Sequence, residues 1–480
     1  MLRKRRIWGG WTAVFVVAVL LVIGCGGGGG GGDNGSPITF SISGTVTSGG
    51  AALPSVTVAL TGAASASTTT DASGNYRFAG LLSGAYTITP SIPGYGFTPA
   101  NQQETISSAD ITGVDFSATP NTARAWGRNV AGQLGDGSTT QRNAPVQVRD
   151  SGGLQYLTEV VAVSCGWSHT LALRADGTVW AWGSGLSGQL GDGQGMNSAL
   201  PVQVSNLSGV VAIAAGNLHS LAILSNRTVW AWGWNGSGQL GDGSTTQRNA
   251  PVQVSNLINV VAIAAGNFYS LALRTDGTVW GWGDNGYGQL GVNPSITPES
   301  NVPVQASGLT NMTTIACGYR HSIAIRSDGT VWAWGDNSYG QLGRNTGGIP
   351  SSTPAQVMSI SDVAAIAGGE YHTIAAKSEG TVWTWGLNDN GQLGIGPSPP
   401  QSDDAVQVTG LSGVVAVAAG SYHSVILGSD GTIWTWGQNF DGQLGDGGTT
   451  QRNAPFQVPG LINIDKIAAG QSHTAVVKSP

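Results

Sequence analysis

The sequence predicts an all-β protein in which a seven-bladed β-propeller follows a small N-terminal β-sandwich. A motif of the form WGxNxxGQLG recurs seven times after residue 120, and each repeat has room for four short strands. Residues 38–119 instead alternate between apolar and polar side chains with a period of two, interrupted by turn residues. The 76 glycines follow no three-residue period, which excludes collagen, and 40% hydrophobic residues exclude a largely disordered chain.

The chain begins with the pattern of an export signal. Residues 3–6 are all basic, and residues 7–24 form an apolar stretch. The segment Leu21–Cys25 resembles the lipobox of bacterial lipoproteins, in which the Cys becomes acylated and N-terminal. We therefore expect a lipoprotein signal peptide over residues 1–24 and lipidation, including palmitate, at Cys25. The alternative is an uncleaved stretch that spans the membrane once.

A glycine-rich tether over residues 25–37 follows the signal. Seven consecutive glycines at residues 26–32 cannot hold a fold, so this segment is a flexible link between a lipid anchor and the folded domains. By analogy with sorting in Gram-negative bacteria, Gly26 rather than Asp after Cys25 favours the outer membrane. We expect an outer-membrane lipoprotein of the bacterial cell envelope, which faces either the surface or the periplasm.

The charge balance argues against a nucleic-acid partner. The formal net charge is −6, but four of the 20 basic residues lie in the export signal, which leaves 16 against 26 acidic residues. Non-specific affinity for nucleic acid comes mainly from neutralised phosphates, so a chain this acidic binds polyanions poorly. We therefore expect no nucleic-acid partner.

Residues 38–119 are expected to form a small antiparallel β-sandwich. Val56–Leu60 and Tyr86–Ile88 alternate as strands do, and Asp71–Asn75 has turn residues. The order of strands and turns resembles the carboxypeptidase regulatory-like, or transthyretin-like, domain. Asp71 is expected to be a turn residue and not a calcium ligand, because no other carboxylates cluster around it. We interpret this domain as a spacer.

The propeller is expected over residues 120–480. The WGxNxxGQLG motif, with close variants, begins at Trp126, Trp182, Trp232, Trp282, Trp334, Trp385 and Trp436. A second motif, two small residues followed by Gly-x-x-His, ends at His169, His219, Tyr269, His321, His372, His423 and His473. Between the two motifs lie a strand, a turn such as Asp-Gly and another strand, which predicts a hairpin. Each repeat therefore supplies the four strands of one blade.

Both motifs closely resemble the regulator of chromosome condensation repeat, whose family forms seven-bladed propellers. The first repeat lacks its early strands and the last lacks its late ones, so we expect the two ends to complete one blade and close the ring. The eukaryotic founder of the family is a nucleotide-exchange factor that also binds chromatin. The acidic charge and the export signal argue against both activities here. Light sensing through paired tryptophans, as in a photoreceptor of the family, is an alternative.

Recurrence separates structural residues from functional ones. The six histidines share one repeat position, filled by Tyr269 in the seventh copy, so we expect them to be structural. Cys165 and Cys317 share a small-residue position three blades apart, too far for a disulfide, and are expected to be buried free thiols. Tryptophans paired two residues apart are expected to pack between blades. We find no nucleophile elbow, P-loop or paired carboxylates outside turns, and predict no enzyme activity, catalytic residue, cofactor or metal site.

Function is expected on one face of the propeller, which we call the mouth. In a four-strand meander, the connection before the recurring His and the WGxNxxG connection emerge on the same side. The variable positions of these loops are rich in aromatic residues. The candidate partner-binding residues are Trp167, Trp234, Phe268, Tyr287, Tyr319, Tyr339, Tyr371, Tyr422 and Phe440. Charged residues such as Arg320 and Glu370 surround them.

Aromatic rings with a few charges are typical of protein-binding hot spots. We therefore predict a non-catalytic, monomeric scaffold that binds a protein of unknown identity. The alternatives are a carbohydrate-binding protein or an envelope hydrolase that uses the same face, or rings that only cover the central channel. The divergent loops Val292–Asn301, Arg344–Thr353 and Ile395–Asp404 would direct a partner towards blades four to six.

Overall fold

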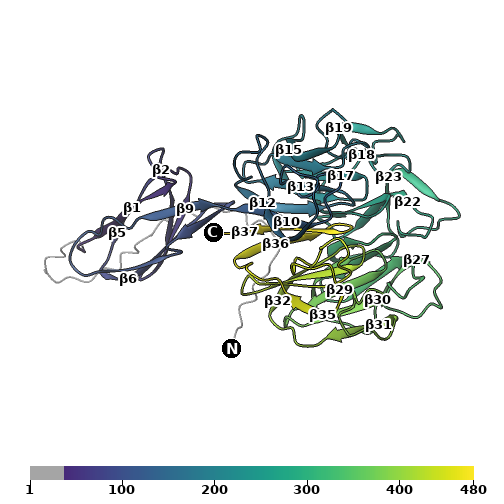
Figure 1. Cartoon of the computed structure of the whole chain (residues 1–480). Helices are drawn as coiled ribbons and strands as arrows, with labels where there is room; N and C mark the ends of the chain where they lie inside the picture. The colour runs from purple at the N-terminus through teal and green to yellow at the C-terminus, as the bar shows by residue number, and fades with distance from the viewer. Residues whose placement is uncertain (1–36) are drawn as a thin grey trace, which may run out of the picture.

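The computed structural model describes residues 37–480, which form a sandwich and a larger ring of sheets (Figure 1). The predicted signal peptide, Cys25 and all but the last residue of the glycine-rich tether lie outside the described residues. Residues 37–480 consist of strands, turns and loops, and no helix among them is long and apolar enough to cross a membrane. The fold is all-β, with a β-propeller behind an N-terminal β-sandwich, as the sequence predicts.

The sandwich consists of two sheets. One has the order β2-β1-β9-β7 with β5 paired to β1, and the other has the order β4-β3-β6-β8. Its strands are β1 (Phe40–Ser48), β2 (Ala51–Ala52), β3 (Thr57–Gly62), β4 (Ala66–Thr69), β5 (Asn75–Leu81), β6 (Gly84–Ser91), β7 (Tyr95–Thr98), β8 (Gln102–Ile106) and β9 (Phe116–Pro120). Ile42 and Val58 are fully buried in the core between them. Asp71 accepts hydrogen bonds from the backbone N–H groups of Ser73 and Asn75, as a turn residue does.

Seven four-stranded sheets form the propeller, and six of them are continuous in sequence. The first three comprise β12 (Val160–Cys165), β13 (His169–Arg174), β14 (Val179–Gly183), β15 (Ser198–Gln203), β16 (Val210–Ala215), β17 (His219–Leu224), β18 (Val229–Gly233), β19 (Arg248–Gln253), β20 (Val260–Ala265), β21 (Tyr269–Arg274), β22 (Val279–Asp284) and β23 (Glu299–Gln305). The next three comprise β24 (Met312–Cys317), β25 (His321–Arg326), β26 (Val331–Gly335), β27 (Ser351–Gln356), β28 (Val363–Gly368), β29 (His372–Lys377), β30 (Val382–Leu387), β31 (Gln401–Val408), β32 (Val414–Ala419), β33 (His423–Gly428), β34 (Ile433–Gly437) and β35 (Arg452–Gln457). Each is an antiparallel meander, as the hairpin pattern predicts.

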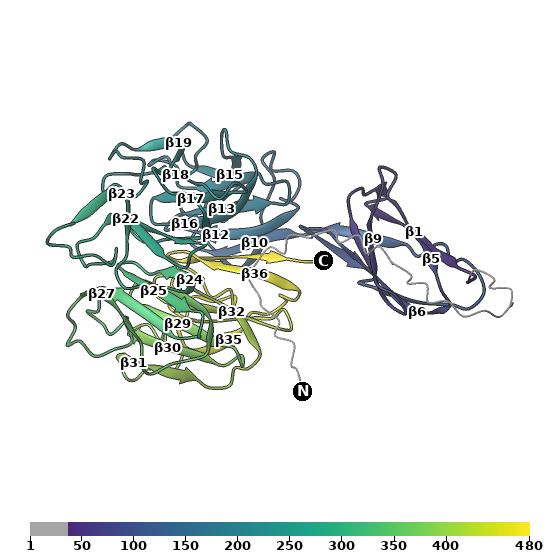
Figure 2. The same ribbon diagram turned by 180° about the vertical axis from the view of Figure 1, so that it is seen from behind.

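The seventh sheet joins the two ends of the propeller. Its strands, in the order β11-β10-β37-β36, are β10 (Thr122–Gly127), β11 (Arg142–Gln147), β36 (Ile464–Ala469) and β37 (His473–Lys478). β10 pairs with β37 from Thr122 opposite Lys478 to Gly127 opposite His473. Figure 2 shows β10 beside the yellow strands at the end of the chain. The predicted closure of the ring by its two ends is confirmed.

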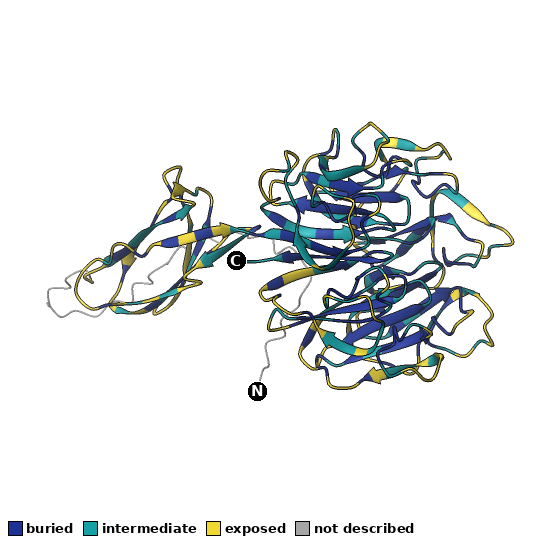
Figure 3. Cartoon of the chain, in the orientation of Figure 1, coloured by how far each residue is buried: buried dark blue, intermediate teal, exposed yellow. Residues whose placement is uncertain are grey.

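One tryptophan of each pair is fully buried between neighbouring sheets. The Trp182 indole Nε1 donates a hydrogen bond to the Gln133 backbone oxygen of the preceding sheet at 2.9 Å. The same bond recurs at the other six motifs. Trp180, two residues earlier, is only half-buried and donates to Thr178 beside the turn. The prediction that both rings of a pair pack between the blades is therefore correct in full only for the second ring, because Trp180 is partly exposed and Trp182 is not. Figure 3 shows that buried residues lie mainly in the strands of the ring and exposed residues mainly in its outer loops.

A single residue, Asn121, separates the last sandwich strand from the first propeller strand. Its backbone N–H donates to the Gly94 carbonyl at 2.7 Å, and its side chain contacts Asp465 of β36. The hydroxyl of Tyr95 in β7 donates to the Glu159 carboxylate, next to β12, at 2.7 Å. Hydrogen bonds on both sides of the connection therefore fasten the sandwich to the propeller.

Candidate functional site

The recurring histidines link neighbouring blades below the mouth. His169 Nε2 lies 3.0 Å from the Ser220 hydroxyl of the next sheet, and His473 closes the circle with a 3.0 Å contact to Thr170. Equivalent contacts join the other four histidines to the hydroxyl of the next blade. Tyr269 occupies this position in the one repeat that lacks a histidine, and its hydroxyl donates to a backbone oxygen of the next blade. This placement agrees with the structural role that recurrence predicts.

Each of these histidines is neutral. Thr170 Oγ1 donates to the Gln133 carbonyl at 2.9 Å, so it must accept its other hydrogen bond from His473 Nε2. The Nδ1 atoms of the six rings have no hydrogen-bond partner within residues 37–480. Burial lowers the pKa of His169 to about 3, and the other five histidines behave alike. Such rings cannot exchange protons near neutral pH, which a general acid or base requires.

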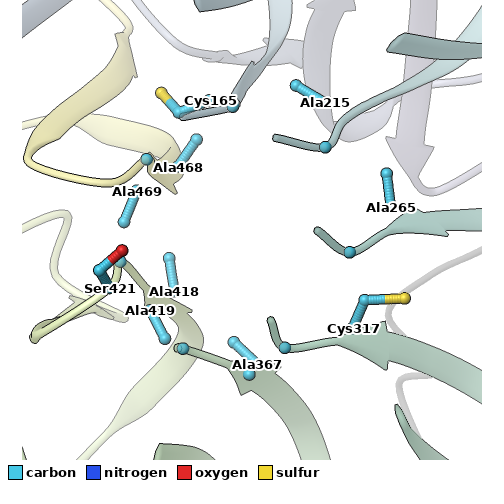
Figure 4. Close-up of a pocket in the computed structure, with 18 of the residues that line it drawn as sticks. Cys165, Ala215, Ala265, Cys317, Ala367, Ala418, Ala419, Ser421, Ala468 and Ala469 are labelled. Atoms are coloured by element: carbon cyan, nitrogen blue, oxygen red, sulfur yellow. The ribbon is translucent and has the colours of Figure 1, made fainter. Parts of the chain in front are cut away.

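A central channel runs between the innermost strands of the seven blades. Its volume is about 310 Å³, and it is lined mainly by Ala and Gly. Figure 4 shows Cys165 and Cys317 on opposite sides of the opening, with their sulfur atoms pointing away from its centre. Both thiols are free, as predicted, although Cys317 is only partly buried. Because burial raises the pKa of each thiol to about 12, both stay protonated at neutral pH.

Five of the nine predicted residues form one group of touching rings over the channel. The ring centroid of Tyr371 lies 4.9 Å from that of Tyr339, 6.2 Å from Tyr319 and 6.3 Å from Tyr422. Trp167 reaches Tyr319, which lies three blades away, at 6.1 Å. Tyr339 is 37% exposed and the other four are half-buried. We call these five residues the aromatic cluster.

Four further predicted residues lie outside the cluster, and three of them make contacts of their own. The Arg320 guanidinium lies 4.6 Å from the Tyr287 ring centroid and donates to its hydroxyl at 3.0 Å. It also lies 5.3 Å from the ring of Tyr319, which connects Tyr287 to the cluster. Trp234 and Phe268 form a separate pair with centroids 4.7 Å apart. The contacts of Arg320 with Tyr287 and of Trp234 with Phe268 each join a loop before the recurring His position to a WGxNxxG loop, so both kinds of loop share one face, as predicted.

The rim of the mouth carries an apolar strip that the sequence analysis missed in part. The ninth predicted residue, Phe440, is 64% exposed, and Val130 and Leu186 are 64% and 70% exposed. All three occupy the position after the Asn of the WGxNxxG loop, or after Gly185 in the second repeat, in three neighbouring blades. The other four blades have Gly, Ser or Asp there. Comparison of the repeats at this one position would have identified Val130 and Leu186.

The charged side chains of the mouth have different kinds of neighbours. Arg128 lies 4.0 Å from Asp441, and Arg320 is engaged with Tyr287. Glu370 lines the channel, as Trp167 and Tyr319 do. Burial, followed by the charge of Glu370, raises the pKa of Tyr371 to about 12, and the same causes raise that of Tyr422. The Glu370 carboxylate therefore lies beside both tyrosines.

Among residues 37–480, no three His, Cys, Asp or Glu side chains come together as the ligands of a metal ion would. What the mouth offers is a set of aromatic faces, two arginines and several carboxylates around an open channel. These features are suited to binding.

Fold and mouth together define a repeat β-propeller with one aromatic-rich face. Family models match the RCC1-like domain at residues 248–480, the regulator of chromosome condensation (RCC1) repeat at 125–173 and 176–223, and the carboxypeptidase regulatory-like domain at 41–119. The chain is 35% identical to the ultraviolet-B receptor UVR8 of Arabidopsis thaliana over 346 residues, which are 70% of this chain and 77% of that protein. It belongs to the RCC1 repeat family.

Other relatives match over shorter stretches. The probable human E3 ubiquitin-protein ligase HERC6 is 38% identical over 36% of this chain. The human E3 ubiquitin-protein ligase HERC2 is 39% identical over 33% of this chain. These matches span only 18% and 3% of the ligases themselves. Among solved structures, yeast RCC1 (Prp20) bound to Kap60 and human WBSCR16 superpose with TM-scores of 0.67 and 0.66. They are 23% identical over 75% of this chain, covering 88% and 99% of theirs, which shows the propeller fold alone.

Proposed function

We propose that this propeller is a non-catalytic scaffold that binds another protein through the aromatic cluster, on a chain anchored by lipid in the bacterial cell envelope. One observation carries the proposal: five rings from four blades touch one another over the channel and yet remain partly exposed. Rings that only filled a core would be buried. Partly exposed, mutually packed aromatic side chains are those that dominate binding energy at protein interfaces.

Relatives support the class of partner. One solved structure holds yeast RCC1 (Prp20) bound to Kap60, and another describes the binding of Prp20p to Gsp1p and histones. Propellers of this family thus include protein-binding ones. The acidic charge of the present chain and its own set of mouth residues favour a different partner.

The test places a photo-crosslinking amino acid at Tyr339 in cells, because that ring is the most exposed of the cluster. We expect a discrete crosslinked protein that disappears when Tyr371→Ala and Tyr422→Ala are combined. The matched control is the same amino acid at Met358, which is 81% exposed in a connection on the opposite face of the ring. A crosslink that persists in the double variant would argue against the cluster. Binding on a glycan array that needs the same rings would favour carbohydrate instead.

The proposed anchor is tested separately. The basic and apolar residues before Cys25 support export and lipidation. We expect Cys25→Ser to release the protein from the membrane fraction, because each buried acyl methylene contributes about 0.8 kcal/mol to membrane binding. Retention of the variant in membranes would indicate an uncleaved anchor. If the wild-type protein were absent from the outer-membrane fraction, the proposed location would be wrong.

A further inference from the structure

The channel contains one residue that the repeat does not require. Glu370 is the only charged residue among those that line the channel in the described part of the chain. The same repeat position holds Trp167, Asn217, Asn267 and Tyr319, and then Ser421 and Gln471. Residues that build the propeller recur in nearly every blade, as the histidines do. Glu370 occurs once, so its carboxylate is not needed for the fold.

This carboxylate has no cationic partner within residues 37–480, where no salt bridge includes it. The nearby Arg320 is already engaged, because it donates to the Tyr287 hydroxyl at 3.0 Å and stacks on that ring. The channel lining consists mainly of alanine methyl groups and glycine backbone, and Ser421 and Gln471 occupy the position of Glu370 in the next two repeats. Glu370 is partly exposed at the open channel, so its unpaired carboxylate can be reached by a cationic group that enters the mouth and would attract it.

The aromatic cluster supplies the second requirement for holding a cation. Tyr371 and Tyr422 lie beside Glu370, and Tyr319 and Trp167 extend the rings across the channel. The faces of aromatic rings carry partial negative charge and attract ammonium groups, most strongly where water is excluded. A carboxylate surrounded by rings is therefore a site for an organic cation.

We infer that the mouth binds a lysine side chain of the protein partner, whose ammonium pairs with Glu370 while its alkyl stem packs against the aromatic cluster. This inference rests on the proposed function, since it specifies what the bound protein presents. A lysine fits better than an arginine, because a compact point charge on an apolar stem matches one carboxylate above walls of methyl groups. The planar guanidinium of arginine instead favours bidentate pairing and polar neighbours.

The experiment measures binding of the full chain, purified in detergent, to an array of random peptides. Each peptide is made in three versions, with lysine, acetyl-lysine or arginine at its centre. We expect a subset of peptides to bind with lysine and to lose about tenfold or more in affinity with acetyl-lysine. Glu370→Gln, which keeps the shape of the side chain, should abolish this difference. Asp389→Asn, which removes an exposed carboxylate of the same mouth, should leave it unchanged.

The outcomes separate this inference from the proposed function. Equal binding of the lysine and acetyl-lysine versions overturns the inference, as does a preference for lysine that survives Glu370→Gln. If such peptides still lose binding in the Tyr371→Ala, Tyr422→Ala variant, the mouth binds proteins in another way and the proposed function stands. If no peptide binding depends on those two tyrosines, both are overturned. A stronger response to arginine than to lysine also contradicts the inference. Melting temperatures of all variants exclude misfolding as the cause.

Discussion

At the residue scale, the six buried histidines make the folded propeller a poor proton acceptor. Each imidazole is enclosed by backbone on one side, where a Cβ on Gly166 would lie 2.5 Å from His169 Nδ1. This close contact explains why the histidine motif has glycine at that position. On the other side, Nε2 bonds to a hydroxyl of the next blade. A further proton could bind only at Nδ1, which has no hydrogen-bond partner among residues 37–480, and the resulting charge would be buried without a partner.

The free energy of unfolding should therefore fall as the solution is acidified. The folded pKa of His169 is about 3, against 6.5 for a free histidine, so the full stability is present above pH 6.5. Between pH 6.5 and about 4 the unfolded chain takes up protons that the folded chain does not. Each such histidine lowers the free energy of unfolding by about 1.4 kcal/mol per pH unit in this range. Denaturant unfolding at pH 7, 6 and 5 measures the slope.

A matched variant identifies the source of that slope. Tyr269→His restores a seventh histidine at the one position that lacks it, where the side chain is fully buried. It should steepen the pH dependence by one proton. Stability that stays constant between pH 7 and 5 would contradict the neutral, buried histidines described above.

At the scale of the element, the recurring Asn shapes each WGxNxxG loop. Asn337 is 1% exposed and accepts from the Leu342 backbone N–H at 2.9 Å. Its amide donates to the Arg344 carbonyl at 2.9 Å and to Thr346 Oγ1 at 2.7 Å. The amide thereby holds the start of the following loop, Arg344–Thr353, beside the mouth. The other two divergent loops are tied in the same way by the Asn of their own repeats.

Asn337→Ala should therefore destabilise the propeller. The substitution leaves the Leu342 N–H and the Arg344 carbonyl without their partner in a buried site, which costs about 2–3 kcal/mol in the free energy of unfolding. Asn345→Ala, at an exposed position in the same loop, should cost less than about 0.5 kcal/mol. Denaturant unfolding of both variants checks the difference. Similar losses in the two variants would show that the buried amide does not hold the loop.

The strands could be predicted from the sequence because the same pattern of apolar, turn and glycine residues recurs in each repeat. The four strands of a blade and the pairing of β10 with β37 follow from motifs that recur and from the strands missing at the ends. Contacts between repeats were not predictable. Trp167 and Tyr319 meet across the channel, and this distance depends on the width of the ring. Trp180 and Trp182 share a face of one strand, yet only the structure shows that their depths differ.

At the scale of the whole molecule, the propeller is held closed by hydrogen bonds between its two ends. β10 comes from the start of the propeller and β37 from its last residues, and they form the middle of one sheet. Ala123, Ala125 and Val477 are fully buried in this sheet. The same sheet lies next to the connection to the sandwich, since Asn121 contacts Asp465 of β36. The ring and its junction to the sandwich therefore depend on the same C-terminal strands.

Removal of residues 461–480 should open the ring. The truncation deletes β36 and β37, so the backbone of β10 loses its pairing partner and the buried faces of two neighbouring blades become exposed. We expect the truncated chain to melt at a lower temperature and to elute as aggregates in size-exclusion chromatography, while full-length protein elutes as a single species. Removal of residues 479–480 alone keeps every paired strand and should leave both properties nearly unchanged. If the longer truncation left melting and elution as they are in the full chain, the ends would not close the ring.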